Sequence, residues 1–150
     1  QRCRKLAEAL FPKHPVQLHH DLKELSCGNW EMQAWDAIPK EEIQPWMADF
    51  VNTAVPNGES YIQMHKRVVD RFEQIQEHPG PAAIVAHGGV LRSILSHVTG
   101  TPLKESFDAF SPHYGCVVKL TGQGNSFRHE MLYNYSAAGK EWHRPSEHLK

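Results

Sequence analysis

Residues 82–100 read AAIVAHGGVLRSILSHVTG, and this stretch decides the fold. It opens with five small or apolar residues, a run that is typical of a strand buried on both faces of a parallel sheet. His87 and two glycines follow, and apolar residues then recur at the spacing of an amphipathic helix that Gly100 ends. A strand, a glycine turn and a helix in this order predict α/β layers around a mixed or parallel sheet.

The turn after this strand is also where we expect chemistry. In open α/β sheets, ligands bind outside the carboxyl ends of the strands, where a helix N-terminus offers free N–H groups to an anion such as phosphate. Gly88 and Gly89 would let a ligand approach the backbone, and His87 would stand beside it as a donor or acid–base group. The alternative interpretation is a tight turn in which His87 only packs.

The remaining segments predict further helices and a hairpin. Helices are expected at residues 1–10, 30–38, 45–51, 61–77 and 90–98, and strands at 16–18, 82–86, 116–120 and 126–135. Ser60 is a suitable N-cap for the helix at 61–77. A turn is expected at 122–125, and the last fifteen residues read as a polar tail.

Composition and charge exclude several classes of protein. Of the 150 residues, 40% are apolar and 22% are charged, which suits one folded domain and excludes a disordered tail. Because 16 Lys and Arg balance 17 Asp and Glu, we expect no nucleic-acid partner. No apolar run approaches the roughly 20 residues that cross a bilayer, and no leader is visible, so no membrane partner is expected. Three cysteines without motif spacing predict free thiols in the cytoplasm.

A second segment with candidate chemistry lies at residues 22–31. Glu24 and Glu31 flank Gly28 and Trp30 in a stretch that reads as irregular. A carboxyl group beside an aromatic ring in a partly dry cleft is suited to act as a general acid. Two solvated loop glutamates are the alternative interpretation, because most glutamates are exposed.

The chain has 11 histidines, and several lie close together in the first loop. His14, His19, His20 and Asp21 do not match the ligand spacing of a standard zinc site. We therefore expect no metal and interpret these residues as surface side chains.

Aromatic residues cluster between residues 30 and 50. Trp30, Trp35, Trp46, Met47 and Phe50 could line a pocket for an apolar or aromatic ligand. The alternative interpretation is the buried face of a core or cap.

Four segments, in chain order, carry a family resemblance: the helix at 2–8, Leu-Lys-Glu to Gly-Asn-Trp-Glu at 22–31, Gly-Glu-Ser at 58–60 with Arg67, and the His87 motif at 84–92. Together they resemble the histidine phosphatase superfamily and, within it, the α-ribazole phosphatases. The resemblance implies a three-layer α/β/α phosphoglycerate-mutase-like fold with a mostly parallel central sheet. It also implies one domain over 1–150, with a cap-like helical segment at about 30–51.

The sequence departs from the family pattern at one important position. The family's Arg-His-Gly motif, which carries the nucleophilic histidine on the first strand, has no match among these residues. The resemblance therefore implies that the first strand and the nucleophile lie upstream of Gln1. Met32 also stands where many relatives have Gly, and Leu6 stands where many have Thr.

The resemblance implies metal-independent hydrolysis of a phosphomonoester through a phosphohistidine, without a cofactor. Arg2, His87 and the Gly88 N–H would bind the phosphate. Glu24 would protonate the leaving oxygen and then activate the water that cleaves the phosphohistidine. The expected partner is a small phosphorylated metabolite, α-ribazole 5′-phosphate of cobalamin synthesis. A cap lined by Trp30, Trp35 and Trp46 would suit its flat base.

Other functions remain open at this stage. A broad sugar-phosphate phosphatase and a phosphoglycerate-mutase-like enzyme would share the same motifs. A non-catalytic domain that binds a phosphorylated ligand or a partner protein is the alternative from a different class, because the nucleophile is missing. Without the first strand, the 150-residue chain is expected to be inactive alone and either poorly stable or self-associating, which would give a homo-oligomer.

Overall fold

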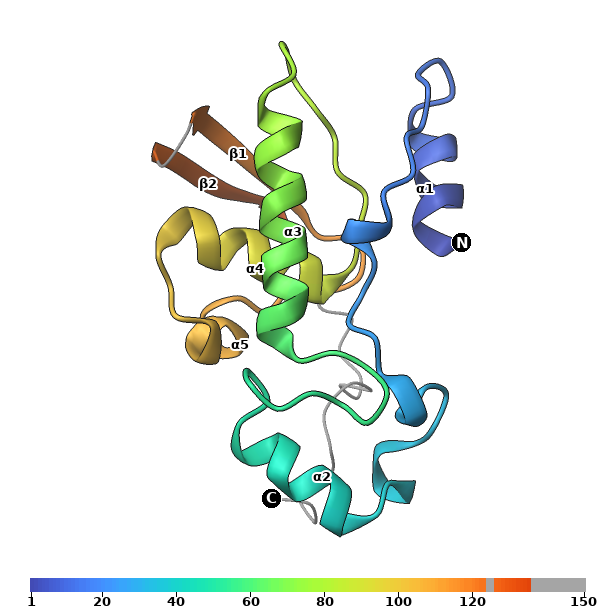
Figure 1. The fold of residues 1–150 in the computed structure, drawn as a ribbon. Helices are drawn as coiled ribbons and strands as arrows, with labels where there is room; N and C mark the ends of the chain where they lie inside the picture. The colour runs from blue at the N-terminus through green and yellow to red at the C-terminus, as the bar shows by residue number, and fades with distance from the viewer. Residues whose placement is uncertain (124–125, 136–150) are drawn as a thin grey trace.

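The computed structural model describes residues 1–123 and 126–135, and Figure 1 shows the arrangement of its elements. The α-helices are α1 (Arg2–Leu10), α2 (Lys40–Ala48), α3 (Tyr61–Gln76), α4 (Gly88–Thr99) and α5 (Ser106–Ala109). The 3₁₀ turns are η1 (His20–Leu22), η2 (Gly28–Trp30), η3 (Trp35–Ala37) and η4 (Leu103–Glu105), and the strands are β1 (Val117–Gln123) and β2 (Ser126–Tyr133). Helices α3 and α4 cross at the centre, with α1 on one side, the hairpin on the other and α2 at one end.

Helix α3 begins where the sequence predicts it. The Ser60 side chain accepts a hydrogen bond from the Gln63 N–H, and the Gln63 side chain accepts one from the Ser60 N–H, so the two residues form a capping box. This arrangement satisfies two N–H groups that a helix start would otherwise leave without partners. The predicted N-cap is confirmed.

The main core lies between α3 and α4. Tyr61, Met64, Val68 and Phe72 project from one face of α3 at helical spacing, and they pack with Val90 and Ile94 of α4. His87 is the N-cap of α4 in an extended conformation, and Gly100 ends the helix with a φ of 70°. The predicted amphipathic helix is therefore confirmed, and its core face fixes the helix N-terminus relative to α3.

A second, smaller core holds together the segment that includes η2, η3 and α2. Its buried side chains are Trp30, Ile38, Ile43 and Val55. The segment is thus a folded layer of its own, at the end of the molecule away from the hairpin.

Two tight loops, at residues 26–29 and 56–59, join this segment to the rest of the chain. The Asn29 N–H donates to Pro56 O at 2.9 Å, and the Glu59 N–H donates to Ser26 O at 3.1 Å. A Cβ on Gly28 would overlap Pro56 O, and Gly28 also has a φ of 45°. The glycine is needed because the two backbones lie in direct contact.

The strand predicted at residues 82–86 is wrong. Among the described residues, the only sheet is the antiparallel pair β1–β2. Residues 82–86 make no strand-to-strand hydrogen bonds. Ala82 and Ala83 are exposed, and Ile84 to Ala86 are half-buried. A strand forms only where a neighbouring strand takes up its N–H and C=O groups, and no strand among the described residues lies beside residues 82–86.

Other predicted elements differ in detail. The strand at 16–18 is absent. The helix predicted at 30–38 is also absent, and this range holds only the last residue of η2 and the short turn η3. Helix α2 begins at Lys40, before the predicted start at Pro45, because Glu41 and Glu42 in its first turn favour a helix N-terminus. The hairpin is confirmed by pairs such as Lys119 with Glu130. Residues 124–125 of the predicted turn and the predicted tail at 136–150 lie outside the described residues.

No helix in the described part of the chain has both the length and the apolar character needed to cross a bilayer.

Candidate active site

Helix α1 lies against the extended segment that leads into α4. The Cys3 thiol donates a hydrogen bond to Ala86 O at 3.3 Å, and Cys3 Sγ also lies 3.4 Å from His87 Nε2. One residue earlier, Arg2 Nη2 lies 3.2 Å from His87 Nδ1. The fold therefore brings the predicted phosphate-binding residues Arg2 and His87 together, although 85 positions separate them in the sequence.

The His87 ring stands at the N-terminus of α4, where it is half-buried. Burial lowers the pKa of His87 below its ordinary value of 6.5, the nearby Glu24 carboxylate opposes that shift, and Arg2 adds to it. At neutral pH the ring is consequently neutral, with one nitrogen as donor and the other as acceptor. An anion bound at this position would favour the protonated ring.

The half-buried Glu24 side chain reaches the same helix N-terminus. Glu24 Oε2 accepts a hydrogen bond from the Gly89 N–H at 3.2 Å, and Oε1 accepts one from the Leu25 N–H at 3.1 Å. A Cβ on Gly89 would overlap the Glu24 carboxylate and would come within 3.2 Å of Met64 Cε. The carboxylate of the predicted acid, Glu24, thus packs directly against Gly89, the second glycine of the His-Gly-Gly turn.

The first glycine of the turn has more room around it. A Cβ on Gly88 would meet only Arg92 Nη1 at 3.8 Å and Pro112 Cγ at 3.9 Å. This space leaves the helix start accessible to a ligand, as the prediction of a phosphate site at Gly88 requires.

Arg92 is a charged residue beside this site to which the sequence analysis gave no role. Its Nε donates to Phe110 O at 3.0 Å, and the guanidinium lies over the Phe107 ring, 4.5 Å from the ring centroid. These contacts hold a positive charge next to Gly88. Arg92 follows Gly88 by four residues, so the two lie on the same face of α4. This spacing is the sequence signal that predicts Arg92 beside the site.

These groups together suit the chemistry of a phosphate ester. Arg2, Arg92 and the N-terminus of α4 supply positive charge, and His87 supplies a hydrogen bond. Glu24 is a carboxyl group beside them that can give or take a proton. Within the described residues, no three His, Cys, Asp or Glu side chains lie close enough together to hold a metal ion.

The predicted cap tryptophans occupy different environments. Trp30 is only 5% exposed, and its Nε1 donates to Glu42 Oε2 at 3.0 Å. Trp46 stacks on Trp35 with ring centroids 5.6 Å apart and meets Trp30 edge-on at 5.8 Å. Trp30 therefore belongs to the small core, whereas Trp35 and Trp46 extend from it as a half-buried aromatic pair.

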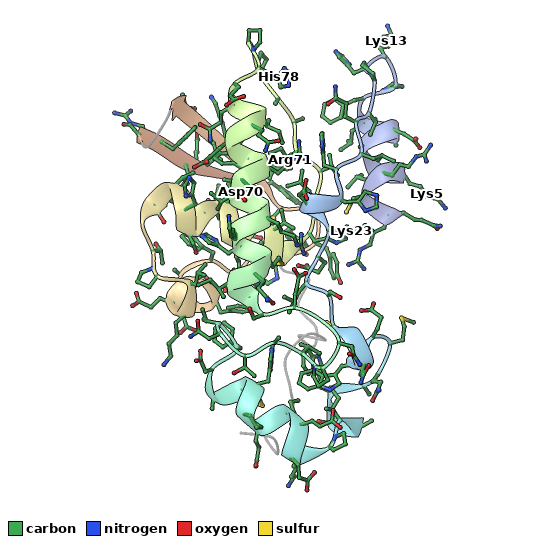
Figure 2. The ribbon with its side chains drawn as sticks, in the orientation of Figure 1. Lys5, Lys13, Lys23, Asp70, Arg71 and His78 are labelled. Carbon is green, nitrogen blue, oxygen red and sulfur yellow. The ribbon has the colours of Figure 1, made fainter. Side chains whose placement is uncertain are left out.

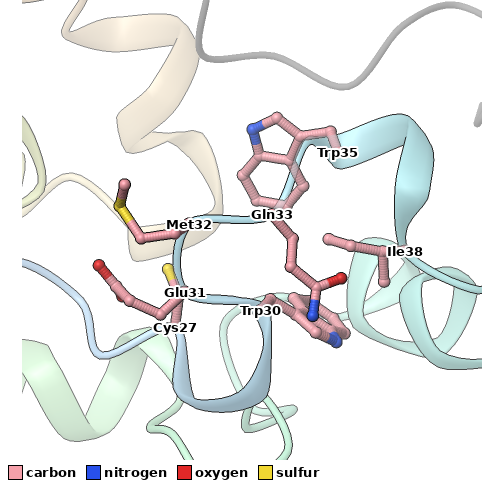
Figure 3. Close-up of a pocket in the computed structure, with 7 residues that line it drawn as sticks. All are labelled: Cys27, Trp30, Glu31, Met32, Gln33, Trp35 and Ile38. Atoms are coloured by element: carbon pink, nitrogen blue, oxygen red, sulfur yellow. The ribbon is translucent and has the colours of Figure 1, made fainter.

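A cavity of about 170 Å³ opens beside Trp35, one member of this aromatic pair (Figure 3). Trp35 and Ile38 form part of its wall, and Met32 lies at its edge with 96% of its surface exposed and a φ of 62°. The full lining is Cys27, Trp30, Glu31, Met32, Gln33, Trp35 and Ile38. Both interpretations of the tryptophans thus apply to this segment. Trp30 lies in the small core, and Trp35 forms part of a pocket wall.

The sequence model of the histidine phosphatase superfamily (branch 1) matches residues 1–135. The chain belongs to this family. The resemblance predicted from the four motifs is therefore confirmed.

Two curated proteins illustrate the range of this histidine phosphatase's relatives. The adenosylcobalamin/alpha-ribazole phosphatase of Escherichia coli is 28% identical over 108 residues, which cover 68% of this chain and 52% of that protein. The metal-independent phosphoserine phosphatase of Arabidopsis thaliana is 36% identical over 85 residues, which cover 53% of this chain and 36% of that protein. The chain thus matches about half the length of the first relative and a smaller part of the second.

Two solved structures share the fold of this chain and agree with the predicted fold class, whereas the described residues do not form the expected mostly parallel central sheet, since their only sheet is antiparallel. The alpha-ribazole phosphatase of Shigella flexneri superposes with a TM-score of 0.75 at 24% identity, over 93% of this chain and 72% of that one. The YhfR protein of Bacillus stearothermophilus gives a TM-score of 0.76 at 22% identity, over 90% and 70% of the two chains. Identities this low establish the fold and not the substrate.

Alanine at Gly89 is expected to lower the thermal stability, whereas alanine at Gly88 is expected to keep or raise it. The Gly89 Cβ would displace the Glu24 carboxylate, while Gly88 has space, and alanine is favoured in a helix by about 0.5–1 kcal/mol. Melting temperatures from circular dichroism measure both effects. In a Glu24→Ala background, the loss caused by Gly89→Ala should shrink. An equal loss of melting temperature in both backgrounds would show that the Glu24 carboxylate does not contact Gly89.

Proposed function

We propose that this protein is a metal-independent phosphatase that hydrolyses phosphomonoesters through a phosphohistidine intermediate. The observation that carries the proposal is the meeting of Arg2, His87 and Glu24 at the N-terminus of α4. These residues come from three segments that are far apart in the sequence, and each supplies a group that phosphoryl transfer requires. Membership of the histidine phosphatase family supports the same reaction class.

In the proposed mechanism, positive groups neutralise the charge on the phosphate oxygens. The planar guanidinium of Arg2 binds one oxygen, and His87 with the Gly88 N–H holds another. Arg92, which lies close to Gly88, adds a second fixed positive charge. The site then stabilises the transition state by position and charge, without a metal.

Glu24 acts as the general acid and base in this mechanism. It protonates the leaving oxygen as the phosphoryl group moves to the nucleophilic histidine, and it then takes a proton from the water that releases phosphate. The 150 residues contain no Arg-His-Gly motif. In this proposal the nucleophile therefore belongs to a part of the protein outside these residues.

The proposed substrate is α-ribazole 5′-phosphate. A curated relative and a solved structure carry that substrate in their names, and the aromatic pair Trp35–Trp46 beside a cavity suits a flat base. A second candidate is a smaller phosphate ester, because other relatives are named as a phosphoserine phosphatase and a fructose-2,6-bisphosphatase. A cytoplasmic location and a homo-oligomer stay predictions.

The first test measures phosphate release by the protein translated from the complete gene, with EDTA present and no added metal. We expect faster turnover of α-ribazole 5′-phosphate than of phosphoserine or sugar phosphates. Glu24→Ala should lower kcat/KM by about 10²–10⁴-fold, the usual contribution of an acid–base group. His87→Ala should lower it by about 10²–10³-fold, the usual cost of removing one donor that stabilises the transition state. A folded protein that releases phosphate from none of these esters would favour a non-catalytic phospholigand-binding domain.

The role of the aromatic pair is tested by Trp35→Ala. Removing Trp35, the member of the stack that lines the cavity, should raise KM for α-ribazole 5′-phosphate by about 5- to 150-fold, because stacking on a base contributes about 1–3 kcal/mol. Ribose 5-phosphate, which has no base, is the control substrate and should keep its KM. Equal changes for both substrates would mean that Trp35 supports the fold and does not contact the base.

The lowered pKa of His87 predicts a pH-dependent affinity for anions. A bound dianion favours the protonated ring, so binding takes up a proton wherever the free ring is neutral. Sulfate, which stays a dianion between pH 5 and 8, should bind more tightly as the pH falls across roughly this range, by at most about tenfold per pH unit. Isothermal titration calorimetry measures the change, and His87→Gln should flatten it. A pH-independent affinity would show that the bound anion does not favour the protonated form of the His87 ring.

A further inference from the structure

Arg67 of α3 is turned toward the backbone of the Glu24 loop. Its Nη1 donates to Asp21 O at 2.7 Å and to Lys23 O at 2.9 Å, and its Nη2 donates to Glu24 O at 3.2 Å. One guanidinium therefore holds three carbonyl groups in the four residues that end with the proposed acid.

The same guanidinium also pairs with Glu59, next to the cap of α3. Arg67 Nε donates to Glu59 Oε2 at 2.9 Å, Nη2 donates to Oε1, and Oε1 also accepts the Ser26 N–H at 2.9 Å. Burial alone would raise the pKa of Glu59, but the hydrogen bonds from Arg67 and Ser26 outweigh it and leave the pKa below its ordinary value. The pair thus contacts the backbone of the loop on both sides of Glu24.

Only an arginine can make this set of contacts. Its planar fork offers five N–H groups in fixed directions, whereas a lysine offers three on one nitrogen atom. The carbonyl of Asp21 belongs to the short η1 turn, and those of Lys23 and Glu24 belong to the irregular loop after it, so they depend on a side-chain donor or on water. Replacing the fork would release the loop while the charge remained.

The loop's position determines where the Glu24 carboxylate lies. Arg67 stands on α3, and α3 packs against α4 through Met64 and Val90 among other buried side chains. The main chain of Glu24 is fixed to α3, and its carboxylate accepts a hydrogen bond from the Gly89 N–H of α4. A shift of the loop relative to α3 would therefore carry the carboxylate away from the helix N-terminus.

We propose that the Arg67–Glu59 pair is a positioning device that sets the distance between the acid Glu24 and the phosphate site. Arg67 touches neither the phosphate nor the leaving group in this scheme, and it acts through the loop backbone. The inference rests on the proposed phosphatase function.

Arg71, one turn further along α3, provides the matched control. It donates to the Asp21 carboxylate through Nε at 3.0 Å and Nη2 at 2.7 Å, with a side chain 27% exposed against 23% for Arg67. Figure 2 shows Arg71 on the side of α3 that faces the segment of Lys23. Arg71 therefore ties η1 to the same helix through a side chain and leaves the carbonyls of Lys23 and Glu24 to Arg67.

The experiment compares Arg67→Lys with Arg71→Lys in the protein translated from the complete gene, using two phosphate esters. A sugar phosphate needs a proton on its leaving oxygen, whereas p-nitrophenyl phosphate releases a stable phenolate and does not. Arg67→Lys should lower kcat/KM at least tenfold for the sugar phosphate and less than threefold for p-nitrophenyl phosphate. Arg71→Lys should leave both within threefold. Equal losses for the two esters, or equal losses in the two variants, would overturn the inference.

A second readout does not depend on activity. The amide proton resonance of Gly89 should shift in Glu24→Ala, because the carboxylate acceptor is lost. Arg67→Lys should reproduce most of that shift, and Arg71→Lys should not. If the parent protein cleaves neither ester, the proposed function fails, and this resonance alone decides whether Arg67 positions Glu24. Should Arg67→Lys fail to fold by circular dichroism, Glu59→Gln takes its place, with the same expected results.

Discussion

The packing of α3 against α4 is the interaction on which the candidate site depends. Met64 and Val68 of one helix meet Val90 and Ile94 of the other with almost no solvent exposure, and each such side chain contributes roughly 1.5–3 kcal/mol when buried. Because this interface fixes the helices relative to each other, the N-terminus of α4 has a defined place next to the residues that α3 holds. In the proposed function, α4 provides the phosphate site and α3 supports the loop of the acid Glu24.

The two glycines at the start of α4 have different environments. The Gly89 N–H is occupied by the Glu24 carboxylate, while the space around Gly88 is open. A carboxylate beside a phosphate would repel it, and the positive charges of Arg2 and Arg92 offset that repulsion. In the proposed function, the acid and the anion therefore lie at neighbouring N–H groups of one helix.

Features that depend on local sequence could be predicted, and features that depend on distant partners could not. The Ser60 cap, α4 and the hairpin follow from residues within a few positions of one another. The extended run at 82–86 was predicted as a strand because its composition says nothing of whether a neighbour is present to pair with it. Arg67 was noted only as part of a motif, since its partners are main-chain carbonyls 43–46 positions away and carbonyls leave no sequence signature.

The contact between Ser26 and Glu59 connects the segment that holds the small core to the loop of Glu24, the proposed acid. These two residues join the loops that carry the small core, and Glu59 also pairs with Arg67, which holds the backbone at Glu24. In the proposed function, a substrate that displaces Trp35 would also displace these loops. Specificity and proton transfer would then be coupled, because a shift of Ser26 would alter the distance between Glu24 and the N-terminus of α4.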